Sequence, residues 1–122
     1  MNQLTPLKTL EVAVKAIEDR KGQQTLALDV RNMTPLTDYF VITQATNERQ
    51  LDAIVDNVVK EAEKEGIEVK HVEGKQSGSW ILVDLVDVVV HIFHYSQRGH
   101  YNLERLWQDA PLVDISEWVV EE

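Results

Sequence analysis

Apolar positions near the start of the chain recur every three or four residues, which is the spacing of one helix face. The residues of this face are Leu7, Leu10, Val14 and Ile17. Thr5 and Pro6 are suited to begin the helix, because Thr caps free amides and Pro is well tolerated at the first helical position. Lys21 and Gly22 are suited to end it, with a cation near the negative helix end and a glycine for a left-handed stop.

A second and longer helix is predicted from Asn47 to Gly66. Gln50 follows Asn47 by three residues in the manner of a capping box, and Gly66 provides the stop. The buried stripe of this helix consists of Leu51, Ile54, Val55, Val58, Val59 and Ala62.

Elsewhere the apolar residues follow a period of two, which predicts strands. The predicted strands are 25–30, 39–43, 67–72, 80–83 and 86–93. The third carries Glu68, Lys70 and His71, so we expect it near an edge of the sheet. The last two are joined by a short acidic link and predict a hairpin at the centre of the sheet. Both faces of 86–93 are largely apolar, so we expect this strand to be covered on both sides.

The predicted order of elements is α-β-β-α-β-β-β-α, in which a turn at 96–100 precedes a short final helix containing Leu103, Leu106 and Trp107. This order predicts an α/β fold of the mixed α+β kind, with a single mixed sheet of about five strands flanked by helices. We expect one domain over residues 1–110 and an acidic C-terminal tail over 111–122. Apolar residues in the tail are expected to pin it to a surface: Ile115, Trp118 and Val119.

Composition places the chain among ordinary globular proteins. It has 122 residues, of which 43% are hydrophobic and 27% charged, and it lacks cysteine, so disulfides and thiolate metal sites are excluded. Its N-terminus has no cationic region followed by an apolar core, and its apolar runs are far shorter than the roughly 20 residues that span a bilayer. We therefore expect a cytoplasmic protein.

The charge balance indicates the kind of partner. The chain has 12 Lys and Arg against 21 Asp and Glu, a formal net charge of -9, and no block of adjacent basic residues. Proteins that bind nucleic acid directly need a basic stripe to neutralise phosphates. The charge therefore favours a basic protein as partner, with little or no direct nucleic-acid contact.

Histidines and aspartates are the candidate metal-binding or catalytic groups of this chain. His91 and His94 lie three apart on a predicted strand, so they point to opposite faces and are not placed to share an ion with His100. Asp84 and Asp87 have the spacing of a tight turn more than that of a two-metal nucleotidyltransferase site. We therefore expect no metal, no cofactor and no enzymatic activity.

Two aromatic residues stand at the ends of predicted elements. Trp80 follows Ser77, Gly78 and Ser79, where a glycine-containing loop enters the sheet, and Tyr101 opens the final helix. Trp and Tyr are favoured in the energetic centres of protein interfaces. Trp and Tyr are equally common as core residues whose polar tip reaches water. The pattern alone leaves both the interface and the core interpretation open.

Four segments together resemble the ribosomal silencing factor family, also called Iojap-like. They are TDYFVI (37–42), RQLDAI (49–54), SWILVDLVDVVVHIF (79–93) and YNLERLWQDA (101–110). The resemblance covers about residues 7–110 in order and with compatible spacing. One departure is Val86, where the family commonly has glycine in the turn.

The resemblance implies a fold similar to nucleotidyltransferases without their activity. It also implies binding to the large ribosomal subunit through ribosomal protein L-fourteen, which blocks subunit joining and represses translation. Family positions implicated in this contact fall on Trp80, Leu85 and Tyr101, and we expect these side chains to converge outside the packed interior. The alternatives are a nucleotidyltransferase-like enzyme and a homodimeric scaffold with another client.

Overall fold

The computed structural model describes residues 5–76, 78–101, 105 and 107–119. Its elements are α1 (Pro6–Asp19), β1 (Gln23–Asp29), β2 (Tyr39–Ala45), α2 (Glu48–Lys64), β3 (His71–Glu73), β4 (Trp80–Asp84), β5 (Val88–His94) and α3 (Arg98–Tyr101). This order and the mixed α+β class are those predicted from the sequence.

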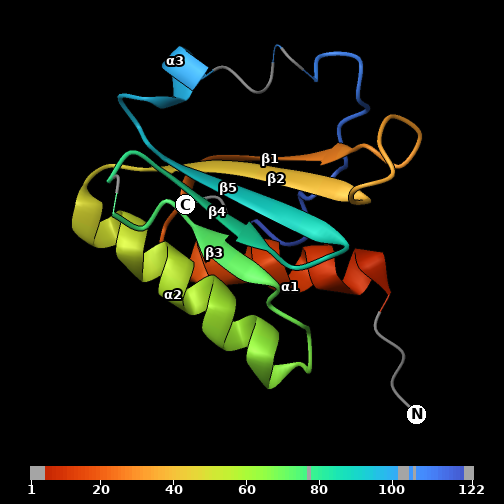
Figure 1. Cartoon of the computed structure of the whole chain (residues 1–122), viewed down its shortest axis with the longest axis horizontal. Helices are drawn as coiled ribbons and strands as arrows, with labels where there is room; N and C mark the ends of the chain where they lie inside the picture. The colour runs from red at the N-terminus through yellow and green to blue at the C-terminus, as the bar shows by residue number, and fades with distance from the viewer. Residues whose placement is uncertain (1–4, 77, 102–104, 106, 120–122) are drawn as a thin grey trace.

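The five strands form one mixed sheet in the order β1-β2-β5-β4-β3 (Figure 1). β2 and β5 run parallel, whereas the other neighbouring pairs run antiparallel. β5 is the middle strand and forms a hairpin with β4, which confirms the prediction for the ranges 80–83 and 86–93. β1 and β3 form the two edges of the sheet.

Helices α1 and α2 lie side by side on one face of the sheet (Figure 1). Their apolar stripes pack against strand residues that point to this face, such as Val41, Val83 and Val90. Between the helices, the buried side-chain amide of Asn57 donates a hydrogen bond of 2.8 Å to the carbonyl oxygen of Ala16. Burial of this face supplies most of the apolar core.

The end of α1 differs from the prediction in one respect. Thr5 caps the start as expected, since its hydroxyl accepts from the amide of Lys8 at 3.1 Å. At the other end the left-handed residue is Lys21, with φ 62°, and not Gly22. Gly22 is required for space instead, because a Cβ at this position would lie 2.4 Å from Cγ2 of Ile17.

The start of α2 confirms Asn47 as the cap, but the return hydrogen bond expected for a capping box reaches one residue further back, to Thr46. Asn47 accepts from the amide of Gln50 at 2.8 Å, and the Gln50 side chain accepts in return from the amide of Thr46 at 2.7 Å. The same side-chain amide donates to the carbonyls of Arg20 and Lys21, at the end of α1. Gln50 therefore joins the end of one helix to the start of the other. Gly66 adopts φ 76° and ends α2 as predicted.

Several predicted elements have different bounds. The strand predicted at 86–93 is β5, which begins at Val88 because Val86 and Asp87 belong to the turn before it. The edge strand predicted at 67–72 is the shorter β3, because residues before His71 connect α2 to the edge and contribute the buried side chain of Ile67 to the core. The final helix begins at Arg98, within the segment predicted to be a turn. Leu103 and Leu106, predicted within this helix, lie outside the described residues.

The C-terminal segment runs along the outer edge of β1. The amide of Val113 donates to the carbonyl of Ala27, and the amide of Asp29 donates to the carbonyl of Pro111, both at 2.9 Å. Beyond this edge the segment joins the core, where the predicted contacts of the tail are found. The residues concerned are Ile115, Trp118 and Val119. The domain boundary at residue 110 stays a prediction.

Candidate partner-binding face

The face of the sheet opposite α1 and α2 carries aromatic side chains. Alternation along β2, β4 and β5 places four rings there, because residues two apart on a strand share a face. A fifth ring, that of Trp107 in the C-terminal segment, meets Phe40 edge to face with centroids 5.0 Å apart. We call this cluster the aromatic face; it consists of Phe40, Trp80, His91, Phe93 and Trp107. Phe93 and His91 are buried, whereas Trp80, Phe40 and Trp107 are only partly buried.

Trp80 begins β4 and lies across the adjacent strand. Its indole stacks on the ring of Phe93, with centroids 5.2 Å apart and planes inclined by 22°. Its indole N–H donates a hydrogen bond of 3.2 Å to Nδ1 of His91. Trp80 is thus a half-buried ring with a defined orientation, which is the condition in which an aromatic side chain gives contact area at low entropic cost.

His91 is the polar member of the aromatic face, and its side chain is enclosed by rings. The residue is 6% exposed, and its ring meets Phe40 edge to face at 5.2 Å and 84°. Burial lowers the pKa of His91 from 6.5 to about 4, because a charged imidazole is poorly solvated there. At neutral pH the ring is uncharged.

Helix α3 is anchored at one end of the aromatic face. The guanidinium of Arg98 is buried and donates to the carbonyl of Gln24 at 2.7 Å and to the side chain of Gln44 at 3.3 Å. Because β5 ends at His94 and pairs there with the start of β4, α3 follows at the end of the sheet where Trp80 lies (Figure 1). Tyr101 is the last residue of α3. Trp80 and Tyr101 therefore belong to elements at one end of the molecule.

Leu85 does not join them, and the expectation that the three side chains converge outside the core is wrong. Leu85 is 2% exposed and packs in the core between the sheet and the helices. It also follows the far end of β4, so five residues, roughly 17 Å of extended chain, separate it from Trp80. The odd spacing directs the two side chains to opposite faces, as alternation on a strand requires.

The aspartates near Leu85 serve the turn between β4 and β5. Asp84 accepts from the amide of Val86 at 2.8 Å, and the amide of Asp87 donates to the carbonyl of Leu85 at 2.9 Å. Asp29, at the end of β1, pairs with Arg31 at 2.6 Å. The turn interpretation of Asp84 is therefore confirmed.

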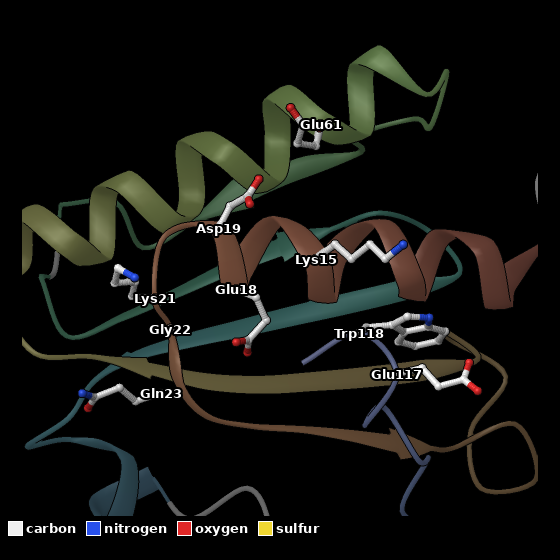
Figure 2. Close-up of a pocket in the computed structure, with 9 residues that line it drawn as sticks. All are labelled: Lys15, Glu18, Asp19, Lys21, Gly22, Gln23, Glu61, Glu117 and Trp118. Carbon is white, nitrogen blue, oxygen red and sulfur yellow. The ribbon is translucent and has the colours of Figure 1, made fainter. Parts of the chain in front are cut away.

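A second candidate is a hollow of about 910 Å³ formed by α1, the α1–β1 turn, α2 and the C-terminal segment (Figure 2). Its walls carry four carboxylates together with Lys15, Lys21 and the ring of Trp118. The carboxylates are those of Glu18, Asp19, Glu61 and Glu117. In Figure 2 these charged ends point in different directions and not toward a common centre. The hollow is therefore a weaker candidate for a binding site than the aromatic face.

Sequence reasoning found Trp80 but missed its partners. Phe40, His91 and Phe93 come from two other strands, and only the register of those strands brings them beside the indole. Trp80 lies opposite Phe93 in that register, and His91 is two residues away on the same face. The sequence signal for His91 is its alternation with Val90 and Ile92. Because those two valine and isoleucine side chains face the helices, alternation places His91 on the opposite face of the sheet.

Two further findings concern the described residues, 5–76, 78–101, 105 and 107–119. Within these ranges, no group of three or more His, Cys, Asp or Glu is arranged to hold a metal ion. Across the same residues, no helix has the length and apolar content needed to cross a membrane.

Comparison with known proteins gives one consistent result. The family described as "Ribosomal silencing factor during starvation" matches residues 3–122. Proteins named ribosomal silencing factor are similar to this chain in Bacillus subtilis, at 44% identity over 94% of the chain and 95% of that protein, and in Halalkalibacterium halodurans, at 43% over 87% and 91%. A crystal structure from Bacillus halodurans matches 89% of this chain and 99% of its own, with 40% identity and a TM-score of 0.80.

Proposed function

The chain belongs to the ribosomal silencing factor family, and from this membership we propose that it binds the large ribosomal subunit and prevents the small subunit from joining. The proposed partner is ribosomal protein L-fourteen, and the proposed result is repression of translation in the cytoplasm. The observation that carries the proposal is the half-buried indole of Trp80 on the sheet face that α1 and α2 leave uncovered.

The proposed contact centres on the end of the aromatic face where Trp80 lies. A ring that is already stacked on Phe93 and hydrogen-bonded to His91 loses little freedom on binding. Tyr101 belongs to the helix at the same end and is proposed as a second contact. Trp and Tyr in such positions are the residue types that dominate interface energetics.

Leu85 is proposed to support the contact surface indirectly. A side chain that is 2% exposed cannot touch a partner unless the hairpin opens. Its role in the proposal is therefore to hold the β4–β5 turn, and through the hairpin the start of β4.

Charge favours a basic protein over RNA as the direct partner. The net charge of -9 repels phosphates and attracts a cationic protein surface, which accelerates association and selects the partner. Such attraction weakens as salt is added, because ions screen exposed charges beyond about 10 Å at 0.1 M.

The proposed inhibition requires occupied space and no catalysis. A standard interface covers about 800 Å² on each partner. That is roughly a tenth of the 7353 Å² that this chain exposes. A molecule anchored through such an area on the docking side of the large subunit excludes the small subunit from the same surface.

Sedimentation with purified large subunits tests the proposed contact. We expect Trp80→Ala and Tyr101→Ala to lose co-sedimentation at concentrations where the unaltered protein binds, since loss of a central interface aromatic costs on the order of 2 kcal/mol or more, or about thirtyfold in affinity. Leu36→Ser is the matched control, because Leu36 is 84% exposed on the β1–β2 loop, away from α3. Undiminished binding of both aromatic variants contradicts the proposed contact.

A subunit-joining assay tests the proposed consequence. Gradient profiles of mixed small and large subunits are expected to show fewer joined ribosomes when the protein is added, and no change with Trp80→Ala. A protein that self-associates and leaves joining unaffected supports the homodimeric scaffold instead. Nucleotide binding that depends on magnesium and is lost in Asp84→Asn supports the enzymatic alternative.

A further inference from the structure

His91 is the buried group whose presence the apolar core does not explain. A valine or isoleucine at this position would continue the β-branched pattern of β5 and avoid the burial of a polar ring. Among the described residues, the His91 side chain hydrogen-bonds only with the indole of Trp80. We propose that His91 is a positioning residue that fixes the orientation of the Trp80 indole for partner binding. This inference rests on the proposed function.

The geometry fixes the tautomer of the ring. The indole N–H can only donate, so Nδ1 of His91 must accept and carries no proton. The proton of the neutral ring therefore lies on Nε2. Nε2 is enclosed and lacks a hydrogen-bond partner in the part of the chain that the structure describes. The ring therefore leaves one buried donor unsatisfied, which is unfavourable, while it presents an acceptor to Trp80.

Trp80 needs such a constraint because its backbone gives it little. It follows a loop in which Gly74 and Gly78 adopt positive φ, and β4 begins at Trp80 itself. Stacking on Phe93 fixes the plane of the indole but is compatible with a half-turn about the Cβ–Cγ bond, which keeps that plane and exchanges the two edges of the ring. The hydrogen bond to Nδ1 selects one orientation, because only one edge of the indole carries a donor.

The consequence for binding is preorganisation. With the N–H edge held at His91, the indole keeps one orientation in the free protein and presents the same surface to every partner. A ring that rotates freely must be fixed at the moment of binding, and this cost appears as lost affinity.

Two substitutions at position 91 separate the acceptor from the packing. His91→Phe keeps a ring of similar size between Phe40 and Trp80 but removes the acceptor. His91→Asn is smaller, but its side-chain oxygen can occupy the place of Nδ1 and accept from the indole. Melting temperature and the dispersion of backbone amide signals report whether each variant folds.

The indole N–H signal of Trp80 gives a direct readout in the free protein. In nuclear magnetic resonance spectra, assigned with the Trp80→Phe variant, we expect a downfield signal that exchanges slowly with solvent. His91→Phe is expected to move this signal upfield and accelerate its exchange, whereas His91→Asn retains both properties. An indole signal that is the same in the unaltered protein and in His91→Phe overturns the inference, whatever the partner of this protein is.

Affinity for purified large subunits gives the functional readout. We expect His91→Phe to bind about five- to tenfold more weakly, the size of one hydrogen bond, and His91→Asn to bind within about twofold of the unaltered protein. In a Trp80→Phe background, which lacks the donor, His91→Phe should have no further effect on affinity.

The outcomes distinguish the two proposals. If His91→Phe weakens binding equally with and without the Trp80 donor, its role is general support of the sheet and the positioning inference fails. If it releases the indole and leaves affinity unchanged while Trp80→Ala abolishes binding, the inference also fails. If Trp80→Ala itself binds normally, the proposed contact fails, and the inference falls with it even where the indole signal behaves as expected.

Discussion

Burial of an ionisable side chain makes the stability of a protein depend on pH, and His91 is a single residue at which this dependence can be measured. Its pKa is about 4 in the folded protein and 6.5 as the unperturbed value taken for the unfolded chain. Between these values the unfolded chain binds a proton that the folded protein excludes. The contribution of a neutral His91 to the free energy of unfolding is therefore fully present above pH 6.5. It declines as the pH falls toward 4, by up to about 3 kcal/mol. Chemical denaturation at pH 7 and pH 4.5 measures this decline.

The control for this pH dependence is His91→Phe, which has no imidazole to protonate. Carboxylates also affect stability in acid: hydrogen bonds from Arg31 and Ser116 lower the pKa values of Asp29 and Asp114, so the stability that these two groups contribute is lost at more acidic pH than that of His91. The difference between the two proteins isolates the contribution of His91. Parallel losses of stability in both proteins would mean that the imidazole is not responsible.

At the scale of elements, β4 shows how one short strand serves two surfaces. Ile81 and Val83 point into the core with the helices, whereas Trp80 and Leu82 occupy the other face. Leu85, one residue beyond the strand, returns to the core side. Substitutions at the odd-numbered positions of this strand should therefore alter stability, whereas those at the even-numbered positions should alter the outer face of the sheet.

The turn that follows β4 holds a strained residue. Val86 has φ 73°, a left-handed conformation that costs a β-branched residue about 1–2 kcal/mol. It is 41% exposed, so its side chain contributes little burial to offset this strain. We expect Val86→Gly to raise the free energy of unfolding by up to about 1 kcal/mol, after the added entropy of glycine in the unfolded chain is subtracted. Thermal and chemical unfolding measure the change.

Val86→Ala provides the comparison for this prediction. Alanine keeps a Cβ and therefore keeps the clash with the backbone that makes the left-handed region unfavourable. Its stability should lie closer to that of the unaltered protein than to that of Val86→Gly. Equal gains from both substitutions would trace the effect to the exposed valine side chain and not to the backbone.

The element order could be predicted because period and caps are local properties of the sequence. Thr5, Asn47 and Gly66 act within a few residues of their own positions, and all three do what the pattern predicts. The start of α3 differs from the prediction because Arg98 reaches strands β1 and β2, and this distant anchor overrides the turn signals around it. The bounds of an element that depend on such non-local contacts cannot be predicted from the local sequence pattern.

The candidate site could be predicted only in part for the same reason. The sequence marked Trp80 by its place after a glycine-containing loop, but the ring's partners depend on the register between β4 and β5. For Leu85, the resemblance gave a role without giving a direction for the side chain. A count of five residues from Trp80 along an extended chain was sufficient to place the two on opposite faces.

For the whole molecule, the two faces of the sheet divide its tasks. The face with α1 and α2 holds the larger apolar cluster and carries the stability of the fold. The aromatic face holds a smaller cluster, over which partly buried rings remain accessible. The same sheet can therefore present a partner surface without exposing the main core.

The C-terminal segment connects these two faces around the edge of β1, and its removal tests the domain boundary at residue 110. It pairs with Ala27 and Asp29 at the edge, and Ile115 packs in the core at 9% exposure. We expect a chain of residues 1–110 to lose about 2–4 kcal/mol of unfolding free energy, because Ile115 and Trp118 no longer cover apolar surface. It should also self-associate more than the full chain, since the edge of β1 then has unpaired backbone groups.

Denaturation and sedimentation velocity of both chains at equal concentration measure these two effects separately. Ile115→Ala in the full chain is the matched control, because it removes core contact while leaving the hydrogen bonds along β1 in place. It should lose stability without the increase in self-association, since the edge of β1 remains covered. A shortened chain that matches the full chain in both measurements would establish residues 1–110 as an independent domain, and the segment beyond it as an appendage of a sheet that is already complete.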